Sequence, residues 1–199
     1  MITLSIIKPL NELSDKKTKK LAEFFNETLG FCPNSVLTMQ KKPNLAEAFI
    51  NLNKAVMENN GGLTPEFKRL IAFVSSSAAG CRYCQAHTSL AAKRYGSSDQ
   101  RLKAVWDYEK SDLFSKKEKI ALKFTHISSI NPIQDDEQLK KNLLDEWSEN
   151  DVIEIIGVIA LFGFLNRWND IMGTKLEEGA LEHSKNYLSD FNWEIGKHS

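Results

Sequence analysis

The 199-residue sequence has no excess of charge of either sign, since 26 lysines and arginines balance 26 aspartates and glutamates. A chain without a basic field is not expected to bind nucleic acid or an acidic membrane surface. Long hydrophobic runs are also lacking. The most apolar stretch, residues 152–165, falls short of the roughly 18 residues that cross a bilayer, and Glu154 interrupts it. We therefore predict neither a nucleic-acid nor a membrane partner.

Cysteine is scarce, and its number is odd, with three residues in the whole chain. This count excludes a small scaffold held by many disulfides and is typical of a reducing compartment. The opening segment, residues 1–9, has a short apolar patch but neither the basic segment nor the long hydrophobic core of a signal peptide. We expect a cytoplasmic protein.

Strand signals, sequence repeats and low-complexity blocks are absent as well. Apolar residues instead recur at helical spacing between helix start and stop signals. The predicted helices are 16–29, 44–58 with an Asn44 cap, 65–78, 81–95, one after Ser98, one after the capping box Ser115–Glu118, 135–147 and 151–169. The prediction is a single all-α domain over residues 1–199, with a core at about 16–176 and a tail or arm at 177–199, where Trp193 suggests docking.

The helix at 151–169 is apolar on nearly all sides, which predicts a central buried helix or one shared with another subunit. Its glycines, Gly157 and Gly163, would permit close helix approach.

The chemistry of the chain centres on Gly80–His87, which holds two of the three cysteines as a Cys-x-x-Cys pair. Cys81 is expected in the first turn of a helix, where free amides and the helix dipole favour a thiolate, so we predict a lowered pKa for at least one sulfur. Residues three apart have Cβ atoms roughly 5 to 6 Å apart, close to disulfide range. His87, one turn after Cys84, is positioned to take or deliver a proton.

Three other readings of the pair remain open. A zinc site would have only Cys81, Cys84 and His87 as ligands. A structural disulfide would close a tiny loop and constrain the unfolded chain little. Two packed, unreactive cysteines are the third alternative. Cys32 has no partner in sequence and is expected to pack as a small side chain.

The helix before the pair, the pair itself and the stretch 165–173 together resemble the carboxymuconolactone decarboxylase family, more narrowly its alkylhydroperoxidase D and peroxidase-related branch. The resemblance covers roughly residues 24–176. It implies a helical alkylhydroperoxidase D-like subunit assembled into trimers or hexamers, with a redox-active cysteine pair that reduces organic hydroperoxides in antioxidant defence. We predict no cofactor and no metal. Decarboxylases of the family lack the redox pair.

The resemblance transfers to individual residues only in part. Cys81 and Cys84 match the redox cysteines. The branch has a histidine where this chain has Thr88, and His87 stands beside it. The branch also has a glutamate where this chain has Arg69.

Three further residues are candidates for roles beside the cysteine pair, where the branch's histidine and glutamate are replaced. Glu66, one turn before Arg69, is a candidate substitute for the branch's glutamate, or simply matches the helix dipole. Arg69, if it points inward, would stabilise a thiolate by its charge. Tyr83, between the cysteines, would hold a water or pack.

The leading prediction is therefore a thiol peroxidase. Cys84 attacks the peroxide with His87 as base, Cys81 resolves the sulfenic acid as a disulfide, and an external dithiol protein reduces it. The alternatives are a thiol-disulfide oxidoreductase acting on a protein partner and a non-catalytic, redox-sensing oligomer.

Overall fold

The computed structural model describes residues 5–199, so the first part of the apolar patch at 1–9 lies outside the described residues. The described chain is all-helical, as predicted, and contains no strand. Its helices are α1 (Lys16–Thr28), α2 (Asn34–Met39), α3 (Pro43–Met57), α4 (Pro65–Ala78), α5 (Arg82–Arg94), α6 (Asp99–Ala104), η1 (Val105–Asp107), α7 (Lys116–Ser129), α8 (Glu137–Glu146), α9 (Glu149–Met172), α10 (Glu178–Tyr187), η2 (Ser189–Phe191) and η3 (Gly196–His198). Among these residues no helix is both long and apolar enough to span a membrane.

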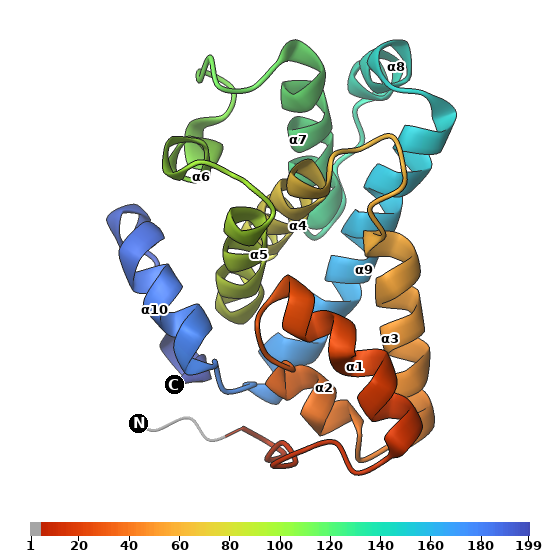
Figure 1. Ribbon diagram of the computed structural model, residues 1–199. Helices are drawn as coiled ribbons and strands as arrows, with labels where there is room; N and C mark the ends of the chain where they lie inside the picture. The colour runs from red at the N-terminus through yellow and green to blue at the C-terminus, as the bar shows by residue number, and fades with distance from the viewer. Residues whose placement is uncertain (1–4) are drawn as a thin grey trace.

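Helix α4 forms the centre of the molecule and packs against α5, α7 and α9 (Figure 1). Ten successive residues of α4, 67–76, are buried. Its start follows the sequence signals, with the Thr64 side chain accepting the Phe67 amide hydrogen and Pro65 in the first turn. Helix α5 then returns antiparallel to α4, because Gly80 adopts a φ of +76° that favours glycine. This hairpin positions the cysteines at one end of the core.

Helix α3 packs against the long α9, and α1 and α2 pack against α3 (Figure 1). A Cβ on Gly157 would make an ordinary van der Waals contact with Val56 at 3.7 Å, and a Cβ on Gly163 would meet nothing within 4 Å, so neither glycine is required for a close helix approach. Helix α9 is only partly buried, because Ile153 (68%), Ile156 and Ile171 (72%) are exposed. Helix α9 therefore presents an apolar outer side, and α4, not α9, is the central buried helix.

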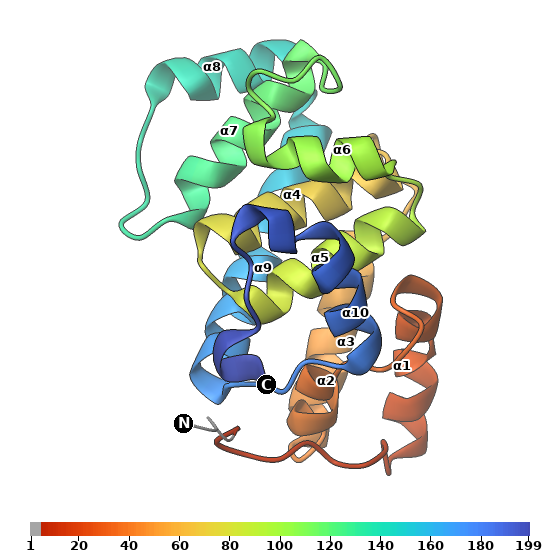
Figure 2. The same cartoon turned by 90° about the vertical axis from the view of Figure 1, so that its left-hand side faces the viewer.

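The C-terminal segment covers α5, as Figure 2 shows for α10 and the residues that follow it. Trp193 is buried, and its Nε1 donates to the Arg82 carbonyl at 3.3 Å, so the prediction that this segment docks is confirmed. Helix α10 itself was not predicted, because its buried face consists of the small or polar residues Ala180, His183 and Ser184 rather than an apolar stripe.

Most predicted helix signals are confirmed, including the caps Thr64 and Ser98 and the capping box of Ser115. The predicted Asn44 cap is wrong, because Pro43 already occupies the first helical turn. The short α2 was not predicted. Helix α9 begins after Ser148, whose capping box with Asp151 replaces the expected start at Asp151.

Candidate active site around a buried cysteine pair

The two cysteines meet at the start of α5. Cys81 is the N-cap residue, and its Sγ accepts the Cys84 amide hydrogen at 3.4 Å. The Cys81 amide in turn donates to the Ser76 carbonyl of α4 at 3.1 Å, which fixes the turn. Both thiols are free, and they are 0% and 2% exposed. The expected closeness of Cys81 to the positive end of the helix is confirmed.

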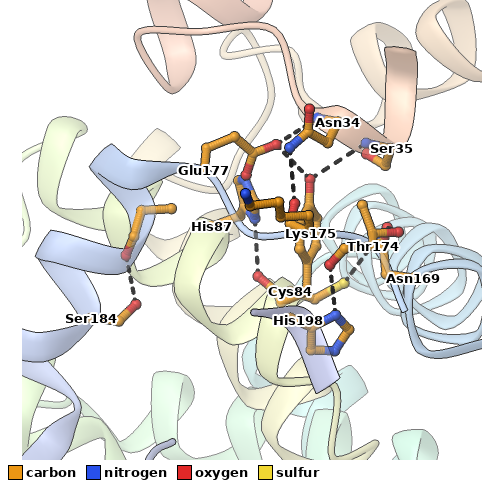
Figure 3. Close-up of polar contacts among 12 residues, drawn as sticks. Asn34, Ser35, Cys84, His87, Asn169, Thr174, Lys175, Glu177, Ser184 and His198 are labelled. Carbon is orange, nitrogen blue, oxygen red and sulfur yellow. Dashed lines mark hydrogen bonds and ion pairs between the residues drawn. The ribbon is translucent and has the colours of Figure 1, made fainter. Parts of the chain in front are cut away.

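The Cys84 sulfur has one hydrogen-bond donor from α9. Asn169 Nδ2 lies 3.3 Å from Cys84 Sγ, and Thr174 Oγ1 donates to Asn169 Oδ1 at 2.9 Å, which orients the amide (Figure 3). Burial raises the pKa of the Cys84 thiol well above its ordinary value, the neighbouring Cys81 raises it further, and the Asn169 bond only partly offsets both. A lowered pKa is therefore wrong for Cys84, because loss of hydration outweighs the helix dipole.

A cavity of about 70 Å³ opens beside Cys84. Its walls are mainly apolar and aromatic and include Phe24, Phe25, Leu29, Val36, Phe49, Met57, Phe162 and Leu165. Cys84, His87 and Asn169 line it, whereas Cys81 is not among its lining residues. A wider surface groove of about 600 Å³ shares Phe24, Met57 and Arg69 with the cavity. A substrate in the cavity would meet the sulfur of Cys84 first.

His87 is held by acceptors on both ring nitrogens. Its Nδ1 lies 2.9 Å from the Tyr83 carbonyl oxygen, and its Nε2 lies 2.8 Å from Glu177 Oε2 (Figure 3). The Glu177 contact is at an ion-pair distance, since neither His87 Nε2 nor Glu177 Oε2 has a hydrogen bond within the described residues. The structure shows no hydrogen bond between His87 and Cys84. The expected pairing of His87 as base with Cys84 is replaced by an ion pair that suits a proton donor.

Glu177 is the acceptor of this polar network. Its Oε1 accepts the Asn34 amide hydrogen at 2.5 Å and the Tyr83 hydroxyl at 2.8 Å. Burial alone would raise the pKa of Glu177, but the charge and hydrogen bond of His87, with these donors, lower it overall. Burial, followed by the charge of Glu177, raises the pKa of Tyr83, which stays a neutral phenol. Tyr83 therefore binds a carboxylate, where a water or simple packing was expected.

The structure does not bring Glu66 to the cysteines. Glu66 lies at the opposite end of the α4–α5 hairpin, where its carboxylate accepts from Arg101 Nε at 2.8 Å. Arg69 points inward and lines the far end of the cavity, with its guanidinium 3.9 Å from the ring centroid of Tyr95. Tyr95 is eleven residues beyond Cys84, or about 16 Å along the helix axis.

The Arg69 guanidinium is also bound locally, to the carbonyls of Met57 and Pro65 and to Asn59 Oδ1. Arg69 is not among the groups that shift the pKa of Cys84. The relay role of Glu66 and the thiolate-stabilising role of Arg69 both fail because the antiparallel hairpin carries these residues away from the pair.

Sequence reasoning missed three partners of the pair: Asn169, Glu177 and His198. Asn169 lies in the quoted stretch 165–173, so it was within reach of the sequence argument. Glu177 and His198 lie in the tail, where no motif marks them. His198 is buried. One of its ring nitrogens, the Sγ of Cys81 and a carboxylate oxygen of Asp170 lie within 4.8 Å of one another, so these atoms could hold a metal ion. Lys197 lies 2.9 Å from Asp170, and its positive charge disfavours a metal ion there, so we assign this cluster no metal.

Comparison with known proteins identifies the class. Residues 43–126 match the model of the carboxymuconolactone decarboxylase family, and the chain belongs to this family. The all-helical architecture matches a 2.15 Å crystal structure of an alkylhydroperoxidase AhpD core, a peroxidase-related protein from Ralstonia eutropha, with a TM-score of 0.75 over 86% of this chain and 92% of that one, at 23% identity. That likeness shows the fold alone.

Two relatives are more similar in sequence. A cysteine-to-alanine variant of the debrominase Bmp8, in complex with 2,3,4-tribromopyrrole, is 33% identical, with a TM-score of 0.88 over 94% of this chain and 100% of that chain. The uncharacterized protein YnjA of Escherichia coli is 32% identical over 111 residues, which are 55% of this chain. The match spans only 60% of the length of YnjA.

Proposed function

We propose that this protein is a dithiol reductase in which Cys84 attacks a small substrate and Cys81 then forms a disulfide with it. One observation carries the proposal: Cys84 lines an apolar cavity, while Cys81 lies behind it with its Sγ 3.4 Å from the Cys84 nitrogen. The first sulfur meets the substrate and the second is within reach of the first.

The burial of the pair favours a small substrate over a protein. Both cysteines are at most 2% exposed, and the cavity beside them holds about 70 Å³. A folded partner protein cannot bring its own disulfide to these sulfurs without a large opening of the site. The structure therefore supports small-molecule reduction over exchange with a protein disulfide.

A halogenated aromatic ring is the substrate class that we favour. The similarity to a debrominase extends over 94% of this chain at 33% identity, and aromatic rings line the cavity. In the net reaction Ar–X + 2 R–SH → Ar–H + R–S–S–R + HX, the thiols supply two electrons and the ring gains a proton. The His87 side chain, held as a proton donor in the same cavity, is our candidate for supplying it.

An organic hydroperoxide is the second candidate, supported by the cysteine pair and by the fold shared with peroxidase-related proteins. Here Cys84 would become a sulfenic acid as the O–O bond breaks and the alcohol leaves with a proton, and Cys81 would expel water as the disulfide forms. An external dithiol is required to reset the pair in either case.

Single-turnover reactions of the reduced protein test both candidates. Brominated pyrroles or phenols and tert-butyl hydroperoxide are offered separately, and bromide, alcohol and lost thiols are counted. One product and one disulfide per chain are expected, with the reaction abolished in Cys84→Ser. Cys32→Ser is the matched control and should react as the wild type does. Unchanged turnover in Cys84→Ser would refute the proposal.

A further inference from the structure

The last turn of the chain carries a histidine into the site. The His198 carbonyl accepts the Leu176 amide hydrogen at 2.8 Å, and His198 Nδ1 lies 2.8 Å from the Thr174 carbonyl oxygen (Figure 3). Because a carbonyl only accepts, Nδ1 carries the proton in the neutral ring. The other nitrogen, Nε2, is buried and has no hydrogen-bond partner in the described part of the chain. A fixed imidazole thus presents a free lone pair in the interior.

Two ionisable side chains lie close to this imidazole. A ring nitrogen of His198, the Sγ of Cys81 and a carboxylate oxygen of Asp170 lie within 4.8 Å of one another, and Asp170 Oδ1 is 3.7 Å from His198 Nε2. Lys197 pairs with the second carboxylate oxygen of Asp170, and the Tyr83 ring lies 5.7 Å from the imidazole. Burial lowers the pKa of His198, as does Lys197, against the opposing effects of Thr174 and Asp170. The imidazole is therefore neutral and able to accept a proton.

Cys81 is the group with a proton to give. Its sulfur already accepts the Cys84 amide hydrogen, which leaves its S–H free to donate. We propose that His198 is the base that takes the proton of Cys81 when Cys81 attacks the sulfur of Cys84, with Asp170 stabilising the imidazolium that forms. This assignment rests on the proposed function only in requiring that the two cysteines form a disulfide.

The step balances without a further reagent. Before it, Cys84 carries a leaving group X on sulfur, either hydroxyl or halide. The Cys81 sulfur forms the S–S bond, the S–X bond breaks, and X leaves with the electron pair. The Cys81 proton moves to His198 Nε2 and departs with X as water or hydrogen halide. A small movement of the imidazole or the thiol closes the remaining gap to hydrogen-bond range.

The attack of Cys81 on Cys84 can be measured without knowing the natural substrate. In a Cys32→Ser background, substoichiometric methyl methanethiolsulfonate caps Cys84 as a methyl disulfide, and Cys81 then displaces methanethiol. Mass spectrometry of acid-quenched samples follows loss of the adduct and gain of the internal disulfide. With His198 as base, the rate should vary little between about pH 6 and 8, since a neutral imidazole removes the proton throughout this range.

Two variants separate a base from a structural role. The amide of His198→Asn still donates to Thr174 but has no basic nitrogen, whereas His198→Ala loses both. We expect both variants to resolve the adduct about 100-fold more slowly near pH 7. Their rates should rise about tenfold per pH unit between pH 6 and 8, because without the base only the thiolate form of the attacking sulfur reacts. Thermal melting confirms that His198→Asn is folded.

The outcomes distinguish the two proposals. Wild-type rate and pH profile in His198→Asn, with a defect only in His198→Ala, would mean that the ring acts structurally and would overturn the inference. Disulfide formation by the wild type would in that case leave the proposed function standing. Failure of the capped wild type to form any internal disulfide would instead refute the dithiol mechanism itself.

Discussion

Removing the carboxylate of Glu177 should destabilise the protein strongly. In Glu177→Gln, His87 loses its ion-pair partner at 2.8 Å, and the acceptor of the Asn34 amide and the Tyr83 hydroxyl becomes a neutral amide. Removing one partner of a buried ion pair costs about 3–5 kcal/mol, out of a typical stability of roughly 5–15 kcal/mol. We take the lower end of this range, about 3 kcal/mol, because the glutamine amide oxygen can still accept from the Asn34 amide and the Tyr83 hydroxyl. For a chain of this length this lowers Tm by roughly 6–12 °C.

The pKa shift of Glu177 also predicts the direction in which the stability of the protein changes with pH. The pKa of Glu177 is lower in the folded than in the unfolded protein, so its contribution is present above the unfolded value of 4.5 and is lost as pH falls through the folded value. Wild-type Tm should therefore fall with acidification below about pH 5 more steeply than that of Glu177→Gln. The difference between the two proteins should be largest near neutral pH.

Calorimetry or circular dichroism from pH 3 to 8 measures both effects. The matched control is Glu182→Gln, an exposed glutamate on α10, the helix that begins directly after Glu177, which should melt within about 0.5 kcal/mol of the wild type. A Glu177→Gln protein that melts with the wild type across this range would show that the Tyr83–Glu177–His87 network is not a stabilising ion pair.

Three further predictions follow from the site and from the exposed side of α9. The rate of Cys84 alkylation by iodoacetamide, measured by peptide mass spectrometry, should keep rising above about pH 8.5, because burial raises the pKa of the Cys84 thiol. A rate that reaches a plateau below about pH 8 would contradict this. Asn169→Ala should slow the single-turnover reaction roughly tenfold, or about 1.4 kcal/mol, by removing the donor to the sulfur, whereas exposed Asn60→Ala should not. We also propose that the apolar side of α9 forms a contact between copies of the chain, so Ile153→Asp with Ile171→Asp should lower the mass found by light scattering; an unchanged mass would exclude this face.

Helix positions and the cysteine pair were predictable because their signals are local. Thr64, Ser98 and Ser115 each satisfy an amide three residues ahead, and such caps are visible in the sequence. The Cys81–Cys84 contact follows from helix geometry in the same way. These signals act within one turn and need no knowledge of tertiary structure.

The partners of the pair were not predictable because they come from distant segments. Glu177 meets Tyr83 across 94 positions in sequence, and Asn169 meets Cys84 across 85. The raised pKa of Cys84 was not predictable for a related reason, since the helix dipole is a local feature and burial is a property of the whole fold. The expected role of Glu66 failed because spacing along one helix ignores the direction in which the next helix returns.

The docking of the tail also affects how related sequences should be compared. The stretch shared with the family model, residues 43–126, contains both sulfurs but none of Asn169, Glu177 and His198. Two relatives could match equally well over that stretch while differing in every group that orients or ionises the thiols. Grouping members of the family by the reaction they catalyse therefore requires aligning the segments that follow the shared stretch. A shortened chain that ends before Trp193 would keep the cysteine pair, but the reactivity of its thiols would change.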